Sequence, residues 1–381
     1  MYRNISALSL ALATTFASTV LASAQVTSSP TDANSVQTGS SPVAYVYVSN
    51  NPGSNNQINA YAAASNGTLS GVKGSPFPTT VSYMAANEKY LFGTDGSDID
   101  SFAIASDGAL QQVDSYLAEP DGGLSSIYLD RSGKTLHADY YTINNDYLSY
   151  SIDNTTGELT FVNDLPGGPP NNSPVSFIGD DAFAYSSSCY HFGPEIVGVQ
   201  RASDGALSYL SGTPPFPTTP TGDFYCPWLA AADPTNHIAI AMQPLNGNWT
   251  TMGPYQLASY TVDGSGNLAT SSTYLNMPQT LVGTVNDYKI SPSGKLLAIG
   301  GSSGLQVFHF NGANPITKYT KLLTTEPVTQ MFWDNANHLY AISQEAGKLY
   351  VYTVTSTSVT AAPGSPYTIP GIEELIVLPK S

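Results

Sequence analysis

The stretch "SPSGKLLAIGGSSGLQVFHF", residues 291–310, contains two short hydrophobic runs separated by a Gly/Ser loop and preceded by a polar turn. Short apolar runs bounded by Gly- and Ser-rich turns are typical of antiparallel β-strands. The stretch lacks the sustained 3.6-residue period of a helix. Because the same order of turn, strand, loop and strand recurs along the chain, the sequence predicts a fold built from one repeated β unit.

One part of this unit recurs with little change: an apolar strand, usually carrying an aromatic residue, then a polar turn and Gly-x-Leu. Clear copies are "INAYAAASNGTL" (58–69), "IDSFAIASDGAL" (99–110), "LSYSIDNTTGEL" (148–159), "IVGVQRASDGAL" (196–207) and "LASYTVDGSGNL" (257–268), with weaker copies at 305–316 and 349–360. The copies recur about every 45 residues, an interval typical of β-propeller blades. Four strands in each of seven repeats predict an all-β, seven-bladed propeller of antiparallel blades.

The two ends of the chain predict how the ring closes. The segment "AYVYVSN" (44–50) corresponds to the second strand of a repeat, and no first strand precedes it. The C-terminal "EELIVLP" (373–379) has the character of that missing first strand. We therefore expect residues 373–379 to pair with residues 44–50 in one sheet, because an open ring would leave an unpaired strand edge.

The N-terminus has the features of an export signal. Arg3 precedes a mostly apolar run at 8–21, and Ala22-Ser23-Ala24 fits a small-x-small cleavage site, so residues 1–24 are predicted to be a signal peptide. The alternative, a membrane anchor, is disfavoured because Thr and Ser interrupt a run too short to span a bilayer. The Ser/Thr-rich residues 25–41 are predicted to be a flexible leader and 42–381 the propeller domain. We expect a secreted or periplasmic protein with no membrane span.

Composition and cysteine content narrow the class of protein. The chain carries 28 Asp and Glu against 12 Lys and Arg, a net charge of −16, which argues against nucleic acid as a partner.

Cys189 and Cys226 are the two cysteines of the chain, and an even count in an exported chain suggests a disulfide. Both fall in loops expected on the same side of the ring, which would allow the bond. The alternative is two free buried thiols.

Several segments resemble a known family. "SPSGKLLAIGG", "LYAISQEAGKLYVYTV" and the repeated "SDGAL" are similar to the seven-bladed propellers of the lactonase, or 6-phosphogluconolactonase-like, family, over about residues 43 to 379. The resemblance implies this fold and, for some members, hydrolysis of sugar lactones or cycloisomerisation of muconate. The matching segments are strand and turn signatures, and many members have no known activity. The stretch expected to hold the family's His-containing segment reads "PNNSPVSFIG" (170–179), with no His or Arg.

Long loops between strands are the natural place for a site on a rigid propeller. The longest predicted loops are 211–228 and 242–256, followed by 139–147 and 186–195. Lactone hydrolysis needs a base to activate water, an oxyanion donor and a wall that binds hydroxyls. The candidate catalytic residues in or beside these loops are Glu195, Asp223, His191 and Asp139, with Glu195 or Asp223 favoured as base and His191 as proton shuttle. The candidate substrate-binding residues are Tyr141, Tyr225, Trp228 and Trp249.

The distribution of cations favours a neutral substrate. A phosphorylated or carboxylated ligand normally needs Arg or Lys, yet Arg131 and Arg201 map to the end of the ring opposite the long loops. No His pair has metal-site spacing, so we expect no metal and no cofactor. The sequence leaves two functions open, both for a protein expected to be a monomer. One is a carboxylic-ester hydrolase that acts on an uncharged lactone, and the other is a non-catalytic propeller that binds a glycan or an envelope protein.

Overall fold

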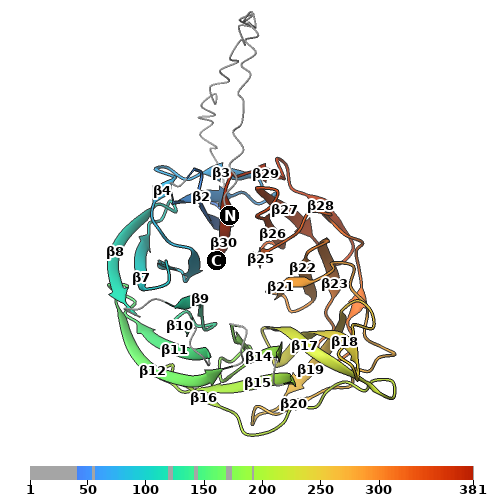
Figure 1. Cartoon of the computed structure of the whole chain (residues 1–381). Coiled ribbons are helices and arrows are strands. Elements are labelled where there is room, and N and C mark those ends of the chain that lie inside the picture. Colours follow the sequence, from blue (N-terminus) through green and yellow to red (C-terminus); the bar gives the residue numbers. More distant parts are fainter. Residues whose placement is uncertain are drawn as a thin grey trace, which may run out of the picture. The chain divides into compact units, whose positions relative to one another are not determined.

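The computed structural model describes residues 41–53, 56–118, 123–140, 145–168, 174–190 and 193–380. All the regular elements in these segments are β-strands, and they form seven antiparallel sheets arranged in a ring (Figure 1). The predicted seven-bladed propeller is therefore confirmed. The predicted signal peptide and nearly all of the leader lie outside the described residues. Across the described segments, no helix is long and apolar enough to cross a bilayer.

Each blade contains four strands, ordered here from the centre of the ring outward. Blade 1 has β30 (Ile372–Pro379), β1 (Ala44–Asn50), β2 (Gln57–Ala63) and β3 (Leu69–Gly71), with β4 (Phe77–Pro78) also paired to β2. Blade 2 has β5 (Tyr83–Ala86), β6 (Tyr90–Thr94), β7 (Asp98–Ile104) and β8 (Leu110–Leu117). Blade 3 has β9 (Leu124–Leu129), β10 (Thr135–Tyr140), β11 (Asn145–Ile152) and β12 (Leu159–Gly168).

The remaining four blades follow the same order. Blade 4 has β13 (Ser176–Phe177), β14 (Phe183–Tyr190), β15 (Gly193–Arg201) and β16 (Leu207–Tyr209). Blade 5 has β17 (Asp223–Ala232), β18 (His237–Asn246), β19 (Gln256–Val262) and β20 (Leu268–Ala269). Blade 6 has β21 (Val285–Ile290), β22 (Leu296–Gly301), β23 (Gly304–His309) and β24 (Thr317–Lys318). Blade 7 has β25 (Gln330–Trp333), β26 (His338–Ser343), β27 (Lys348–Val354) and β28 (Val359–Ala361), with β29 (Tyr367–Thr368) also paired to β27.

Burial falls from the second strand of a blade to the fourth. In β1, β6, β22 and β26 every residue is buried, because these strands have neighbours on both edges and a blade on each face. The outer strand β8 is mostly exposed or half-buried. A strand covered on both faces needs a continuous apolar run, whereas a half-covered strand alternates. The repeated hydrophobic runs in the sequence therefore mark the second strands.

The repeated Gly-x-Leu turn joins each blade to the one before it. Gly108 has φ +86, and a Cβ built there would lie 2.5 Å from the ring of Tyr45. The Tyr47 hydroxyl donates a 3.0 Å hydrogen bond to the Gly108 carbonyl. Tyr185 donates in the same way to Gly266, at 2.6 Å. Both the left-handed backbone and the close approach need glycine. The repeated glycine in the sequence therefore marks the positions where neighbouring blades are in contact.

The C-terminal strand closes the ring as predicted. Strand β30 pairs antiparallel with β1, in a register that places Ala44 opposite Pro379 and Val48 opposite Leu375. The strand begins at Ile372, one residue earlier than predicted. The first blade therefore takes its innermost strand from the other end of the chain, as Figure 1 shows beside the labels β30 and β2.

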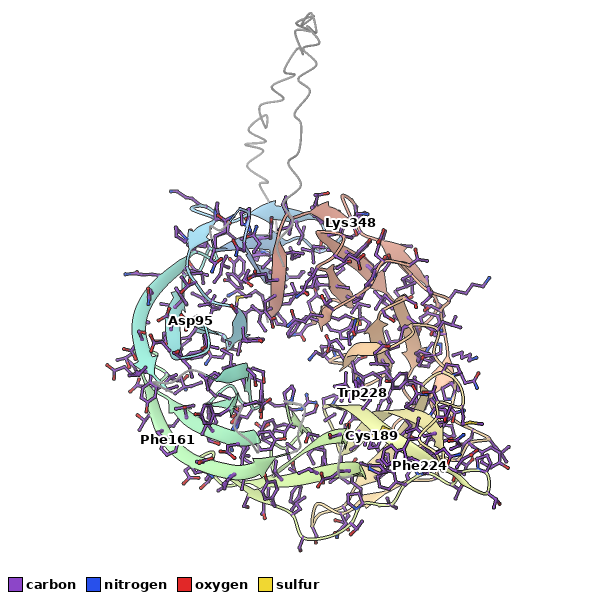
Figure 2. All side chains as sticks on the ribbon, viewed as in Figure 1. Asp95, Phe161, Cys189, Phe224, Trp228 and Lys348 are labelled. Atoms are coloured by element: carbon purple, nitrogen blue, oxygen red, sulfur yellow. A yellow bond between two sulfur atoms is a disulfide. The ribbon has the colours of Figure 1, made fainter. Side chains whose placement is uncertain are left out.

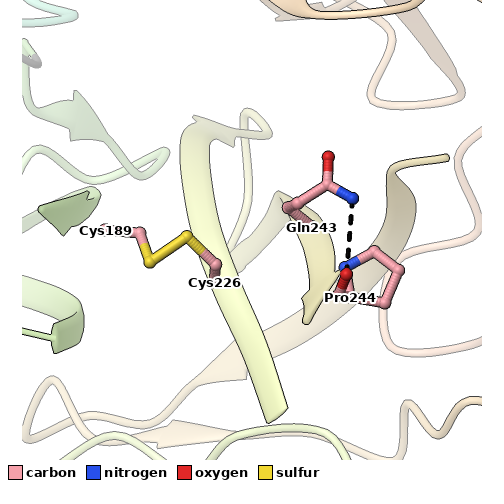
Figure 3. Close-up of a disulfide and its surroundings, with 4 residues drawn as sticks. All are labelled: Cys189, Cys226, Gln243 and Pro244. Carbon is pink, nitrogen blue, oxygen red and sulfur yellow. Dashed lines mark hydrogen bonds between the residues drawn. A yellow bond between two sulfur atoms is a disulfide. The ribbon is translucent and has the colours of Figure 1, made fainter. Parts of the chain in front are cut away.

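The predicted disulfide between Cys189 and Cys226 is also confirmed. It joins β14 of blade 4 to β17 of blade 5, with 5.3 Å between the Cα atoms (Figure 3). Both cysteines lie inside strands, although loops were expected there, because β14 extends to Tyr190 and β17 begins at Asp223. The bond therefore ties the tops of two neighbouring blades together.

Replacing both cysteines by serine is expected to lower the free energy of unfolding by about 3 to 4 kcal/mol, because the bridge restricts the unfolded chain across a loop of 37 residues. Urea unfolding of the double variant and the wild type measures the difference. Wild-type protein in a reductant is the matched control and should unfold like the double variant. Equal unfolding free energies for all three samples would contradict the prediction.

Candidate functional site

The acidic candidates lie at the end of the ring where the innermost strands begin, called here the top end. Asp223 is the first residue of β17, and Asp139 lies near the last residue of β10, which runs up to this end. Figure 2, which draws the side chains, shows an opening at the centre of the ring with Trp228 labelled at its margin. The top end therefore gathers carboxylates from several blades.

Asp139 is fully buried behind the innermost strand of blade 3. Its carboxylate accepts hydrogen bonds from the Ser126 hydroxyl at 2.6 Å and the Tyr128 hydroxyl at 3.1 Å, and both donors lie on β9. Burial raises the pKa of Asp139 to about 7, although the two hydrogen bonds lower it part of the way. Both carboxylate oxygens of Asp139 thus accept hydrogen bonds, and the carboxylate holds the two hydroxyls in place.

Glu195 lies in the third strand of blade 4, where its side chain is exposed. It has no hydrogen-bond or ion-pair partner among the described residues. Burial raises the pKa of Tyr147 well above its ordinary value, and the charges of Asp139 and Glu195 add to this rise. These two acids therefore influence the same hydroxyl from neighbouring blades. His191 and Tyr141, the other candidates from these loops, lie outside the described residues.

Asp223 and Tyr225 lie together in a pocket of about 320 Å³ on blade 5. Tyr225 is buried, and its hydroxyl donates to Oε1 of Gln256, a residue that lines the same pocket. Burial raises the pKa of Tyr225 to about 12, with a further contribution from the charge of Asp223. Trp249 is exposed and packs edge-on against Phe224, another lining residue, with 4.9 Å between ring centroids.

Trp228 belongs to a different environment. Its indole N–H donates a 3.0 Å hydrogen bond to the Val285 carbonyl of blade 6, and its ring packs edge-on against Tyr255. Figure 2 shows Trp228 beside the central opening and Phe224 farther out on the same blade. The three aromatic candidates that the structure describes therefore do not form one wall: Tyr225 lines the blade 5 pocket, Trp249 packs against Phe224 beside it, and Trp228 packs between two blades.

The structure also brings together a polar group that the sequence interpretation missed. Asp287, Lys289, Gln330 and Glu374, called here the inner-strand cluster, lie on the innermost strands of blades 6, 7 and 1. Gln330 donates a 2.5 Å hydrogen bond to Oε1 of Glu374 and accepts another, at 2.5 Å, from the Leu375 amide. Asp287 accepts in the same way from the Met331 amide of the following blade, at 2.6 Å. Polar side chains therefore link three successive innermost strands.

The carboxyl group of Glu374 combines a strongly raised pKa with some exposure to solvent. Burial raises its pKa to about 8, the hydrogen bond from Gln330 lowers it part of the way, and the charge of Asp287 raises it again. Its side chain is half-buried rather than closed off, unlike that of Asp139. A carboxyl group with a raised pKa that keeps some contact with solvent is a candidate acid–base residue.

The cations of the described chain lie mostly away from these acids. Arg131 donates to the carbonyls of Phe177, Ala232 and Asp233, and Arg201 pairs with Asp130 at 2.5 Å. These contacts lie at the bottom of the ring, as the sequence predicted. Within the seven innermost strands, Lys289 is the single cation, and its ammonium group lies 3.5 Å from Oδ1 of Asp287.

Other features of the surface offer less chemistry. A pocket of about 710 Å³ lies between blades 6 and 7 at the bottom end, where Ser293, Asn311, Asn337 and Thr355 are among the lining residues and no carboxylate is present. Among the described residues, no group of three or more His, Cys, Asp or Glu side chains is arranged to hold a metal ion. The two carboxyl groups whose pKa burial raises to about 7 and about 8, those of Asp139 and Glu374, both lie at the top end.

Comparisons with known proteins identify the fold. A protein from Lactobacillus plantarum superimposes with a TM-score of 0.65 at 14% identity, over 88% of this chain and 99% of that one. The periplasmic gluconolactonase of Pseudomonas aeruginosa gives 0.62, with the same identity and coverage. A Bacteroides uniformis protein provisionally named a 6-phosphogluconolactonase gives 0.64, again at 14% identity over 88% and 99%. No family model and no curated protein matches the sequence. The chain therefore shares its propeller fold with these three proteins, two of which are named as lactonases.

Proposed function

We propose that the chain is an exported lactonase that hydrolyses an uncharged, sugar-type lactone at the top end of the ring. The observation that carries the proposal is the Glu374 carboxyl group, half-buried on an innermost strand, with a pKa raised to about 8. A general base works best when its pKa lies near the working pH. The disulfide supports export, because such bonds persist in oxidising compartments.

Glu374 would act as base and then as acid. Its carboxylate takes a proton from water while the water oxygen attacks the lactone carbonyl carbon. The tetrahedral oxyanion needs a donor, and Lys289 offers ammonium protons beyond the one directed at Asp287. The ring C–O bond then breaks, the departing oxygen takes the proton back from Glu374, and a hydroxy acid is formed. The new carboxylic acid loses its proton to solvent, and because the product is then an anion, the surrounding acids favour its release.

The other candidate acids have different roles in this proposal. Asp139 fixes the hydroxyls of Ser126 and Tyr128 on the innermost strand of blade 3 and acts as a positioning residue. Glu195 is exposed on a third strand, and Asp223 lies in the blade 5 pocket. We expect Glu195→Ala and Asp223→Ala to keep hydrolytic activity, which makes them matched controls for replacement of Glu374.

The substrate preference provides a direct test. We expect gluconolactone or galactonolactone to be hydrolysed with a kcat/KM at least about 10-fold above that for 6-phosphogluconolactone. Both arginines of the described residues are engaged at the bottom end, and Lys289 is shared between Asp287 and the oxyanion, so no cation is left on the innermost strands for a phosphate group. Acid release followed by a pH indicator measures all three rates. Hydrolysis of the phosphorylated lactone alone would contradict the proposed neutral substrate. Failure to hydrolyse any lactone would overturn the proposed activity.

A further inference from the structure

The outer part of blade 5 has features of a ligand site that lactone hydrolysis does not use. We infer that the pocket beside Asp223, together with the exposed indole of Trp249, binds a neutral saccharide. This site is separate from the inner-strand cluster, and its existence does not depend on the proposed hydrolysis.

The pocket contains polar groups that the fold leaves free. Its lining includes Asp223, Phe224, Tyr225, Gln256, Tyr274 and Gln279. The Asp223 carboxylate and the Gln279 side-chain amide make no hydrogen bond or ion pair with any residue that the structure describes. Tyr225 binds Oε1 of Gln256, so the NH₂ group of this amide remains as a donor. One carboxylate and two amides therefore provide both acceptors and donors around one pocket.

Aromatic and apolar surfaces gather around the same pocket. Trp249 is 54% exposed, Met252 54% and Tyr274 42%, and the last two line the pocket directly. Trp249 adopts φ +61, which is uncommon for a bulky residue, and its amide donates to the Asn246 carbonyl at 2.9 Å. The turn thus fixes an indole against Phe224 while leaving much of its surface in solvent. Two of these exposed side chains come from the connection between β18 and β19 and the third from the segment after β20, so they gather apolar surface at one place, as ligand-binding surfaces do.

A saccharide matches this combination of groups. A sugar ring presents an apolar C–H face that can pack on an aromatic ring, and hydroxyl groups that pair with carboxylates and amides. No Lys or Arg lines the pocket, which disfavours phosphorylated and carboxylated ligands. The volume of about 320 Å³ is near the small end for ligand pockets and suits a short stretch of sugar units. Figure 2 places Phe224 away from the central opening, so a bound glycan would not need to enter it.

The intrinsic fluorescence of the protein provides the test. The chain has three tryptophans, and two of them, Trp228 and Trp333, donate their indole N–H groups to backbone carbonyls. A panel of neutral oligosaccharides, namely β-1,4-glucan, β-1,3-glucan, β-1,4-mannan and chitin oligomers, is titrated into the mature protein. Emission and heat are recorded. We expect at least one oligomer to shift the emission of Trp249 and to bind with a measurable Kd.

Variants then assign the binding to the pocket. Trp249→Ala, Asp223→Asn and Gln279→Ala should each weaken binding at least about 10-fold while the melting temperature stays near that of the wild type. Tyr209→Ala, which removes an exposed tyrosine on blade 4, should bind like the wild type. Glu374→Gln should also keep the affinity, so loss of hydrolysis and loss of saccharide binding are distinguishable. Absence of binding to all four oligomers, or binding that survives all three pocket substitutions, would overturn the inference.

Discussion

Removing residues 372–381 is expected to leave the protein unfolded. The deletion takes away β30, the innermost strand of blade 1, and exposes the edge of β1. It also removes five buried apolar side chains, those of Ile372, Leu375, Ile376, Val377 and Leu378. At about 1.5 to 3 kcal/mol for each, their burial contributes about 7 to 15 kcal/mol. This equals the whole stability of an ordinary domain, about 5 to 15 kcal/mol. Loss of the melting transition and of soluble protein measures the effect.

A circular permutant separates closure by β30 from a general need for the C-terminus. Ala44 and Pro379 are register partners, so a short linker can join residue 380 to residue 41 and open a new terminus after residue 370. This permutant keeps every strand pair of blade 1 and is expected to melt close to the wild type. A deletion of residues 380–381 alone should change little, because β30 ends at Pro379. A deletion of 372–381 that melts like the wild type would contradict the closure of the ring by β30.

The fold was predictable because its determinants are local and repeated. Each Gly-x-Leu turn needs glycine for the positive φ and for the contact with the preceding blade, as Gly108 shows against Tyr45. Each second strand needs a continuous apolar run because it is covered on both faces, as in β22. The ring closure followed from a second strand at one end of the chain and an unassigned strand at the other. These requirements leave a pattern along the sequence.

The site was predictable only in part, because its chemistry depends on contacts between repeats. Asp139 could be identified as an acid that ends a second strand at the top end. Glu374 lies in the segment that was interpreted only as a closing strand, and its pKa depends on Gln330 and Asp287 from two other blades. The signal that was available was an acidic pair, Glu373 and Glu374, at the start of an innermost strand. The residues of other blades that shift the pKa of Glu374 could be identified only from the three-dimensional structure.

Glu374→Gln is expected to lower kcat for lactone hydrolysis by about 100-fold or more, because the amide cannot accept a proton from water. The substitution keeps the size of the side chain and its contact with Gln330. The wild-type rate should rise with pH through about 8, the pKa to which burial raises this carboxyl group, because only the carboxylate acts as base. This rising limb should disappear in Glu374→Gln and persist in Glu195→Ala. Stopped assays from pH 5 to 9.5 with gluconolactone, corrected for the spontaneous rate, measure both effects.

The stability of the same variant shows whether lost activity reflects lost structure. The pKa of Glu374 is raised from 4.5 in the unfolded chain to about 8 in the folded protein, so the folded state holds the proton more tightly. The contribution of this group to stability is therefore complete below about pH 4.5 and is lost as the pH rises through about 8. Glu374→Gln stays neutral at every pH, so it should be more stable than the wild type near pH 9. If Glu374→Gln is inactive but shows this gain in stability, its loss of activity is due to the missing carboxylate and not to a loss of folded structure. A variant that keeps the rate and the rising limb would remove Glu374 from the mechanism.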